Sequence, residues 1–476
     1  MSLDSDTEAD ILENVEEVMD NLLKELQDLY SYRDLFFENH SIDLALEKNK
    51  RVEEKKEVLV EKFESIDVDT QIPEVLRAKF LYMKGRCYNI SPTYDARATQ
   101  CLSKAVKLCP ALIDAWNELG ESYWKNMNVK EAKSSFEGAL KHECNRLSLR
   151  CLSIILRQEN SDKKRSEAHA AIMKSVDLAK EAVSQDIKDG VSWSVLGNAY
   201  LCQFFMVAQD PATLKLCMSA YKQASLDPIA KGQPDLYYNK GIALKYSEIY
   251  DEALFNFEYA SRLDPPWQPP KQERMRLVTF LNAAHSLVRT RGKLKAKKLA
   301  TMVQAIDKKM LGVYGEGLHA FAGRREVALE HTRLDALEDG PNEARVILGK
   351  VVGSIHNDNA VPFLTAWNTA RPVTELYHQD GITRRQFVCT FALIDESMEC
   401  VLVTVYNWAD GRGAIIGDCV TIPEPLMRTH KYEADDVSFD FKSIRINNPL
   451  LLLVNGKRVA RNQFACTRVT STYEIH

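Results

Sequence analysis

The stretch from residue 116 to residue 139 decides the fold. It reads Trp116-Asn-Glu-Leu119-Gly120-Glu-Ser-Tyr123, and later Ala132-Lys-Ser-Ser-Phe136-Glu-Gly-Ala139. The large residues recur at helical spacing, and small residues stand where two helices would cross closely. The pattern therefore predicts a helix–turn–helix hairpin, which cannot bury its apolar face alone and needs neighbours on both sides.

The same spacing recurs along the chain and predicts a solenoid of tetratricopeptide repeats. A full copy begins at Trp193, and weaker copies begin at Leu81, Leu149 and Tyr237. Two of the separations between copies are longer than the others, so we expect insertions at 159–167 and 203–213. Residues 268–289 keep helical periodicity and predict a helix that caps the end of the stack.

From residue 343 the apolar period becomes that of strands. Runs rich in Val, Ile, Phe, Tyr and Thr predict short strands, with turn signals such as Asn455-Gly456 between them, at 346–353, 387–394, 400–406, 418–422, 439–446 and 450–454. This part fits a small all-β barrel of the oligonucleotide/oligosaccharide-binding (OB) type.

The predicted fold class is therefore mainly α: a tetratricopeptide-repeat solenoid followed by a small OB-fold barrel. We divide the chain into four parts. They are an N-terminal helical hairpin that joins the solenoid (1–70), the repeats with their capping helix (71–290), a basic helix and linker (291–340), and the OB-fold domain (341–476). An inserted loop is expected at 357–385.

Composition sets the class of protein. The chain has 476 residues, 45% of them hydrophobic and 27% charged, with a net charge of −5, which argues against a protein that is basic throughout for nucleic acid. No window approaches a membrane span, and the acidic N-terminus is not a secretory signal. Eleven cysteines without a Cys-x-x-Cys pair indicate free thiols in a reducing compartment.

Catalytic signatures are missing from the sequence. We find no phosphate-binding Gly-rich loop, no His-Glu-x-x-His, no Gly-x-Ser-x-Gly and no metal-ligand spacing. The sequence therefore predicts a protein that is not an enzyme and that holds no cofactor or metal.

The concave face of the repeats offers a candidate binding groove. Helical periodicity places on this face, besides Arg157, Asn198 and Asp235 from successive units, the residues Asp114, Asn117, Glu121, Trp124, Lys125, Tyr238, Lys245 and Tyr246. Arg157 could pair with a carboxylate, Asn198 could hold a peptide amide, and Asp235 could pair with a basic side chain. Spacing alone leaves open that these are ordinary solvent-facing charges.

A basic run follows the capping helix, and between its ends only Asp307 opposes it: Arg289, Arg291, Lys293, Lys295, Lys297, Lys298, Lys308 and Lys309. Such a run is a solvated linker, a weak nuclear-import signal, or a contact for the phosphates of structured RNA. The barrel itself is balanced, with 14 Lys and Arg against 15 Asp and Glu from Pro341 onward. We therefore expect the barrel to contact proteins and not to bind nucleic acid strongly by itself.

Several runs resemble the tetratricopeptide repeat protein five (Strap) family over nearly the whole chain. They include Pro234-Asp235-Leu236, the stretch Lys293-Leu-Lys-Ala-Lys-Lys-Leu299, and Ile415-Ile-Gly-Asp-Cys-Val-Thr-Ile-Pro-Glu-Pro425. The expected insertion at 357–385 departs from this family.

The resemblance implies a function with two alternatives. The first is an adaptor in the cytoplasm that recognises the N-terminal Met-Arg-Glu peptide of nascent tubulin at the ribosome. It then triggers tubulin mRNA decay through a recruited deadenylase, which is tubulin autoregulation. The second is a nuclear transcription cofactor, responsive to stress and DNA damage, that scaffolds a histone acetyltransferase coactivator and an actin-nucleating cofactor.

The resemblance also assigns roles to single residues. The peptide-contacting arginine and aspartate of the family match Arg157 and Asp235, which favours the functional interpretation of these two charges. The ribosome-contacting lysines match Lys295 and Lys297.

Overall fold

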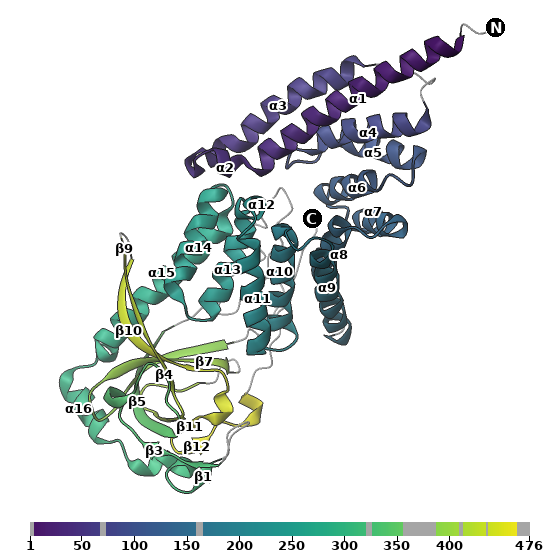
Figure 1. Ribbon diagram of the computed structural model, residues 1–476. Helices are drawn as coiled ribbons and strands as arrows, with labels where there is room; N and C mark the ends of the chain where they lie inside the picture. The colour runs from purple at the N-terminus through teal and green to yellow at the C-terminus, as the bar shows by residue number, and fades with distance from the viewer. Residues whose placement is uncertain are drawn as a thin grey trace.

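The computed structural model describes residues 4–66, 73–158, 165–319, 326–355, 387–408, 413–434 and 437–463. Figure 1 shows a curved stack of antiparallel helices that ends on a β-barrel. The insertion predicted at 357–385 lies outside the described residues, as does the part of the first repeat insertion at 159–164. None of the described helices is long and apolar enough to cross a membrane.

Helix pairs build the solenoid. The N-terminal part holds α1 (Asp4–Asp34), α2 (Phe36–Asn39), η1 (Ile42–Leu44) and α3 (Ala45–Ser65). The pairs that follow are α4 (Glu74–Asn89) with α5 (Ala96–Leu108), α6 (Ile113–Lys125) with α7 (Val129–His142), α8 (Arg146–Gln158) with α9 (Arg165–Gln185), α10 (Gly190–Met206) with α11 (Pro211–Ala224), and α13 (Pro234–Tyr246) with α14 (Tyr250–Leu263). The cap is α15 (Gln268–Arg289), so the repeat solenoid is confirmed.

A glycine in the first helix allows the close crossing within most pairs. A Cβ placed on Gly120 would lie 2.6 Å from Phe136 Cε1, and one on Gly197 would lie 2.5 Å from Tyr221 Cε1. Gly241 stands in the same relation to Phe257, at 2.7 Å. In each of these pairs, an aromatic ring of the second helix therefore occupies the volume that a side chain at the glycine position of the first helix would need.

The two longer separations between repeats have different structural causes. The separation between the copies at Leu149 and Trp193 is long because helix α9 has 21 residues, whereas α7 has 14. The separation between the copies at Trp193 and Tyr237 is long for two reasons. Helix α10 has 17 residues, whereas α6 has 13, and the short helix α12 (Pro228–Lys231) is added before α13. The second insertion is therefore divided between 203–206 and α12, and is not confined to 203–213.

The N-terminal helices extend the stack and also turn back toward its other end. Leu26, Val52 and Phe63 share one apolar core with Phe80 of α4 and Leu119 of α6. At the far end of the repeats, Arg262 Nη2 of α14 lies 3.3 Å from Asp43 Oδ1 of η1. Figure 1 shows α2 beside α12 and α14 accordingly, so the repeats curl around a central space.

The barrel follows from the strand pairing. Strands β5 (Arg345–Ile355), β6 (Phe387–Ile394) and β7 (Cys400–Trp408) form an antiparallel meander, and β10 (Val437–Ile446) joins β7 in parallel. Strand β8 (Cys419–Pro423) pairs with β5, whereas β9 (Leu426–Ala434) pairs with β10. Only Glu424, at φ 44°, and Pro425 separate β8 from β9. The continuous segment formed by β8 and β9 therefore pairs with β5 at one edge of the sheet β5-β6-β7-β10 and with β10 at the other edge, which closes the barrel.

Part of the segment 291–340, which we expected to be a basic helix and linker, belongs to the barrel. The segment from 291 holds η2 (Arg291–Lys293), α16 (Ala296–Gln304), η3 (Lys308–Tyr314), β1 (Leu318–His319), β2 (Val327–Ala328), β3 (Glu330–His331), η4 (Leu334–Ala336) and β4 (Gly340–Pro341). Strand β3 pairs with β5, β4 pairs with β9, and Leu334 is fully buried in the barrel core. These elements are too short to produce a readable period, so the sequence did not reveal that they belong to the barrel.

A buried ion pair joins the repeats to the barrel. Arg445 Nη1 of β10 lies 3.3 Å from Glu248 Oε1 in the turn between α13 and α14. The Arg445 guanidinium lies between two rings, 4.6 Å from the centroid of Tyr246 and 4.0 Å from that of Tyr406. Tyr406 also donates a hydrogen bond to Glu248 Oε1 at 2.9 Å. One charge cluster therefore fixes the barrel against the last repeat.

The start of the basic segment touches the barrel wall without room for a side chain. Gly292, at φ 74°, stands so close to β5 that a Cβ would lie 2.1 Å from the Val352 carbonyl oxygen. Gly353 in turn faces Leu287 of the capping helix. The chain can therefore leave α15 and run along the barrel only because these two positions are glycines.

We expect Gly292→Ala to weaken the packing of the capping helix on the barrel. Gly317→Ala is the matched control, because Gly317 also has a positive φ, of 86°, but no atom within 4 Å of its Cβ position. Both variants place an alanine at a positive φ, and only Gly292→Ala also clashes with β5. The free energy of unfolding should therefore fall by about 1–3 kcal/mol more in Gly292→Ala than in Gly317→Ala. Urea unfolding of both variants measures this difference, and equal losses would contradict the prediction.

Candidate functional site

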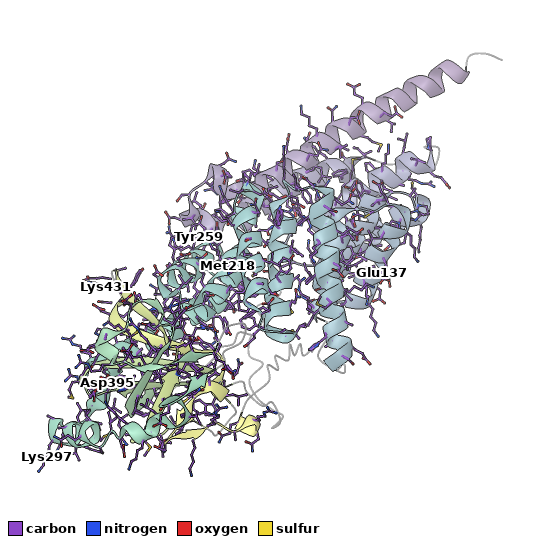
Figure 2. The ribbon with its side chains drawn as sticks, turned by 60° about the horizontal axis from the view of Figure 1, so that its bottom comes forward. Glu137, Met218, Tyr259, Lys297, Asp395 and Lys431 are labelled. Atoms are coloured by element: carbon purple, nitrogen blue, oxygen red, sulfur yellow. The ribbon has the colours of Figure 1, made fainter. Side chains whose placement is uncertain are left out.

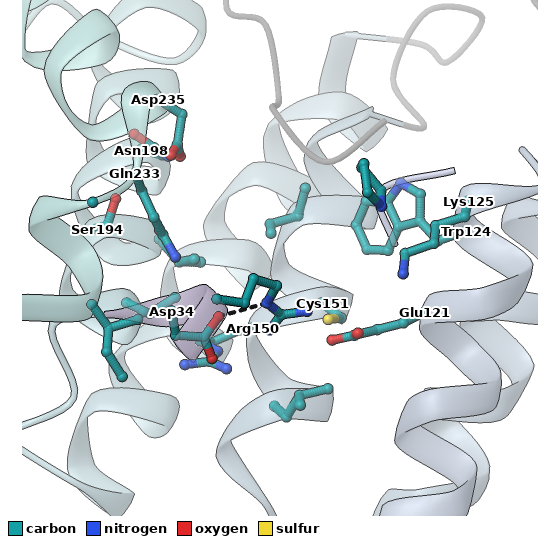
Figure 3. A pocket seen from close by; sticks show the side chains of 18 of the residues that line it. Asp34, Glu121, Trp124, Lys125, Arg150, Cys151, Ser194, Asn198, Gln233 and Asp235 are labelled. Carbon is teal, nitrogen blue, oxygen red and sulfur yellow. Dashed lines mark hydrogen bonds and ion pairs between the residues drawn. The ribbon is translucent and has the colours of Figure 1, made fainter. Parts of the chain in front are cut away.

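The concave side of the solenoid encloses a cavity of about 640 Å³, a size typical of ligand pockets. Its walls come from the inner helices α1, α3, α4, α6, α8, α10 and α13, with residues of the α12 region. Figure 3 shows side chains of this lining, with labelled residues from α1, α6, α8, α10 and the start of α13. The first helix of each repeat thus lines the cavity, as the periodicity predicted.

Arg157 stands in this wall at the end of α8, and its Nη1 donates a hydrogen bond to Ser153 Oγ at 2.7 Å. Ser153 occupies the position where the neighbouring repeats carry glycine, and its own hydroxyl donates to the Ser175 carbonyl of α9 at 2.7 Å. The repeat with the weakest signature therefore replaces the small crossing residue by a serine that holds the guanidinium.

Asn198 and Asp235 line the same cavity from α10 and α13, and Figure 3 shows them next to each other. The Asn198 carbonyl oxygen accepts a hydrogen bond from Tyr221 at 2.8 Å, which fixes the amide. Asp235 is the second residue of α13, directly after Pro234, in the first turn of the helix, where backbone amides are free to face a carboxylate. The structure therefore brings together the three residues that the sequence nominated.

The Asp235 carboxylate is short of partners. Oδ1 is buried without a hydrogen bond among the described residues, and so is Ser194 Oγ, which also lines the cavity. Burial raises the pKa of Asp235 to about 6, opposed by the amides of Asp235 and Leu236 and by Asn198. A buried carboxylate with an unused oxygen is costly to the free protein and is suited to a cationic ligand.

Other charges in the cavity wall are mostly paired. Arg86 Nε lies 3.1 Å from Glu118 Oε1, and Arg150 Nη1 lies 2.7 Å from Asp189 Oδ2. Burial, with the nearby Glu121, raises the pKa of Glu118 to about 7 although Arg86 opposes this. Lys125 Nζ donates to the Ser91 carbonyl at 3.0 Å. These pairs shape the cavity, whereas Asp235 offers an unused oxygen.

The periodicity rule was wrong for several of the expected groove positions. Glu121, Trp124 and Lys125 line the cavity as expected. Asn117 is instead buried between repeats, where it bonds Asn145 and Ser148. The remaining expected residues lie elsewhere: Asp114 is exposed outside the cavity, Tyr238 packs on Trp267, Lys245 pairs with Glu273, and Tyr246 contacts Arg445. In the last repeat the cap and the barrel cover the positions that line the groove in the others.

Two kinds of lining residue were missed. Arg150 and Ser194 follow the signature residues Leu149 and Trp193 directly, so the same rule, applied one position after the signature in every repeat, would have found them. Others come from the N-terminal hairpin: Tyr30, Arg33, Asp34 and Lys48. These have no repeat register, and only the curl of the stack brings them to the cavity.

The nominated lysines of the basic run lie far from this cavity. Lys295 directly precedes α16 and Lys297 is in it, both are exposed, and Leu299 anchors the helix in the core. Figure 2 shows Lys297 at the barrel end of the molecule and Glu137 at the repeat end. The molecule thus carries two separate candidate sites, a cavity and a basic surface.

Metal chemistry has no candidate centre in the part of the chain that the structure describes, where no group of three or more His, Cys, Asp and Glu side chains could hold an ion. The described cysteines are unpaired thiols. What the cavity can do chemically is bind an extended ligand that carries a cation and an anion.

Comparison with known proteins extends these observations. Residues 382–468 match the family described as the tetratricopeptide repeat protein 5 OB fold domain. Among solved structures, the tetratricopeptide-repeat protein YrrB, described as having an unusual peptide-binding site, is 18% identical with a TM-score of 0.29, covering 46% of this chain and 97% of its own. Cut9-Hcn1 of the anaphase-promoting complex is 14% identical with a TM-score of 0.37, covering 55% and 48%.

Two curated relatives cover almost the whole chain. Tetratricopeptide repeat protein 5 of Bos taurus is 39% identical over 461 residues, which is 96% of this chain and 98% of the bovine protein. Its counterpart in Homo sapiens is 38% identical over 464 residues, covering 97% and 98%. This chain, an adaptor-type protein built to contact other proteins, therefore belongs to the tetratricopeptide repeat protein 5 family.

Proposed function

We propose that this protein is an adaptor of tubulin autoregulation. Its cavity binds the N-terminal Met-Arg-Glu peptide of nascent tubulin, its basic surface holds the ribosome, and recruited deadenylases then degrade the tubulin mRNA in the cytoplasm. The observation that carries the proposal is the buried Asp235 carboxylate with an unused oxygen, in the same cavity as Arg157 and Asn198.

The chemistry of the cavity matches the peptide residue by residue. Asp235 is suited to pair with the peptide arginine, and Arg157 with the peptide glutamate. Asn198 carries both donor and acceptor atoms for a peptide amide. Ile154, Cys202 and Met206 supply apolar lining for the flexible methionine side chain. Selectivity follows because a peptide without the arginine would leave the buried carboxylate unpaired.

Two weak contacts on one molecule supply the preference for translating ribosomes. Peptide and ribosome are joined through the emerging chain, so binding at one site raises the effective concentration at the other. The alternative function is a nuclear scaffold for a histone acetyltransferase coactivator. Only the resemblance supports it, and no particular contact among the described residues favours it.

Arg157→Glu should weaken the binding of a Met-Arg-Glu-Ile peptide by at least a hundredfold, about 3 kcal/mol, because the peptide glutamate then meets a like charge. Fluorescence anisotropy with a labelled peptide measures this. Lys104→Glu, a charge reversal on the exposed face of α5, is the control and should bind normally. Unchanged affinity of the Arg157 variant, with both proteins folded by circular dichroism, would end the peptide-binding proposal.

Peptide affinity should also depend on pH through Asp235. In the free protein its pKa is raised to about 6 by burial, and an arginine beside it would lower that pKa, so binding releases a proton. Affinity should then be constant above pH 7 and fall by up to about tenfold per pH unit below pH 6. Asp235→Asn should bind weakly and lose this pH dependence. The same pH profile in both proteins would show that another group is responsible.

Lys295→Glu with Lys297→Glu should reduce co-sedimentation with ribosomes and leave the affinity for the isolated peptide unchanged, because the two sites are separate. Raising the salt concentration should reduce wild-type co-sedimentation in the same direction. Wild-type levels of co-sedimentation by the double variant would rule out the ribosome contact while leaving peptide recognition standing.

A further inference from the structure

Two basic residues far along the sequence join the basic surface only in the folded chain. Strands β11 (Leu453–Val454) and β12 (Lys457–Arg458) form a hairpin around Asn455 and Gly456, with φ values of 51° and 74°. Positive φ at both central residues is the geometry of a tight two-residue turn. Lys457 and Arg458 follow this turn and are exposed, as is Arg461 beyond them.

The hairpin packs directly against η3, which carries the last lysines of the basic run. A Cβ on Gly312 would lie 2.9 Å from the Gly456 carbonyl oxygen, and one on Gly456 would lie 3.8 Å from the Lys309 carbonyl oxygen. The turn that precedes Lys457 therefore touches the backbone of Lys309, although about 150 residues separate them in sequence.

Buried contacts hold this arrangement rigidly. Leu311 and Tyr314 of η3 share an apolar cluster with Leu453 of β11 and Leu348 of β5. Tyr314 donates a hydrogen bond to the Leu451 carbonyl at 2.9 Å, and Thr421 donates to the Met310 carbonyl at 2.8 Å. The backbone positions that carry the exposed cations are thus fixed in spacing.

The cations of this region have no opposing partner. Lys308, Lys309, Lys457 and Arg458 form no ion pair among the described residues. Two acids of this region have other partners: Asp307 accepts a hydrogen bond from the Lys309 amide at 2.9 Å, and Asp418 Oδ1 accepts one from the Asn455 side chain of the hairpin turn at 2.8 Å. Exposed cations that the protein does not neutralise itself favour an anionic partner.

We propose that these four residues form a second phosphate-binding surface for structured RNA, which adds to the proposed ribosome contact of Lys295 and Lys297. We call this surface the hairpin patch and define it as Lys308, Lys309, Lys457 and Arg458. The proposal rests on the proposed ribosome contact, to which it adds the cations of η3 and of the β11–β12 hairpin. Ribosomal RNA is the phosphate source at the ribosome.

Rigid spacing favours RNA over an anionic membrane. A folded RNA presents phosphates at fixed positions, which a fixed set of cations can match, whereas lipid headgroups diffuse and need no such geometry. The patch is built on 3₁₀ turns and a two-residue hairpin held by buried side chains, and not on a mobile amphipathic helix. Arg458 also brings a planar guanidinium suited to a phosphate.

The test measures binding of the full chain to purified ribosomes over a range of salt concentrations. Four proteins are compared: wild type, Lys457→Glu/Arg458→Glu, Lys295→Glu/Lys297→Glu, and Lys104→Glu/Lys107→Glu. The last is the control, with the same change of charge on the exposed face of α5. The Lys457/Arg458 variant should bind more weakly, and its slope of log K against log salt should be shallower by about 2, roughly 1 per lost phosphate contact.

The variants separate this proposal from the one it rests on. If the Lys457/Arg458 variant matches the control in affinity and slope while the Lys295/Lys297 variant is impaired, the hairpin patch is overturned and the ribosome contact stands. If neither variant is impaired, the ribosome contact itself fails. The four proteins are also tested on phosphatidylserine vesicles, and loss of vesicle binding by the Lys457/Arg458 variant with normal ribosome binding would overturn RNA as the partner.

Discussion

One steric constraint governs the helical part of this protein: a ring or branched side chain of the second helix fills the space left by a glycine of the first. It recurs at Gly85, Gly120, Gly197 and Gly241. The close crossing sets how each pair packs on the next, and so sets the curvature of the wall. The exception is Ser153, whose hydroxyl bonds the partner helix and holds Arg157. The repeat that relaxes the packing rule is thus the one that presents a candidate binding residue.

The cavity within this wall separates structural charges from available ones. Arg86 with Glu118 and Arg150 with Asp189 neutralise each other, and removing one member of such a buried pair would strand the other. Asp235 keeps an oxygen without a partner in the part of the chain that the structure describes. In the proposed function this unused oxygen gives specificity, because only a ligand with a matching cation compensates the cost of burying it.

The buried pair of Glu248 and Arg445 connects the cavity to the rest of the molecule. Its two rings and hydrogen bonds join the last repeat to the barrel, and Gly292 brings the basic segment along the same barrel. The cavity and the basic surface therefore lie on one connected scaffold, which keeps them at a fixed separation. In the proposed function, two contacts at a fixed separation would reinforce each other on a ribosome that presents both partners.

The sequence by itself determined the repeats, the capping helix and most strands of the barrel, because periodicity and the spacing of small residues are local properties; strand β9 (Leu426–Ala434) was not predicted and is known only from the structure. It also nominated Arg157, Asn198 and Asp235, since residues at one helical register share a face. Tertiary structure alone decided that Asp43 meets Arg262, that Tyr30 and Arg33 help to line the cavity, and that Leu334 belongs to the barrel core. It also placed the turn at Gly456 against the backbone of Lys309. These contacts join segments with no common period, so they follow from how the whole chain packs and not from any local pattern.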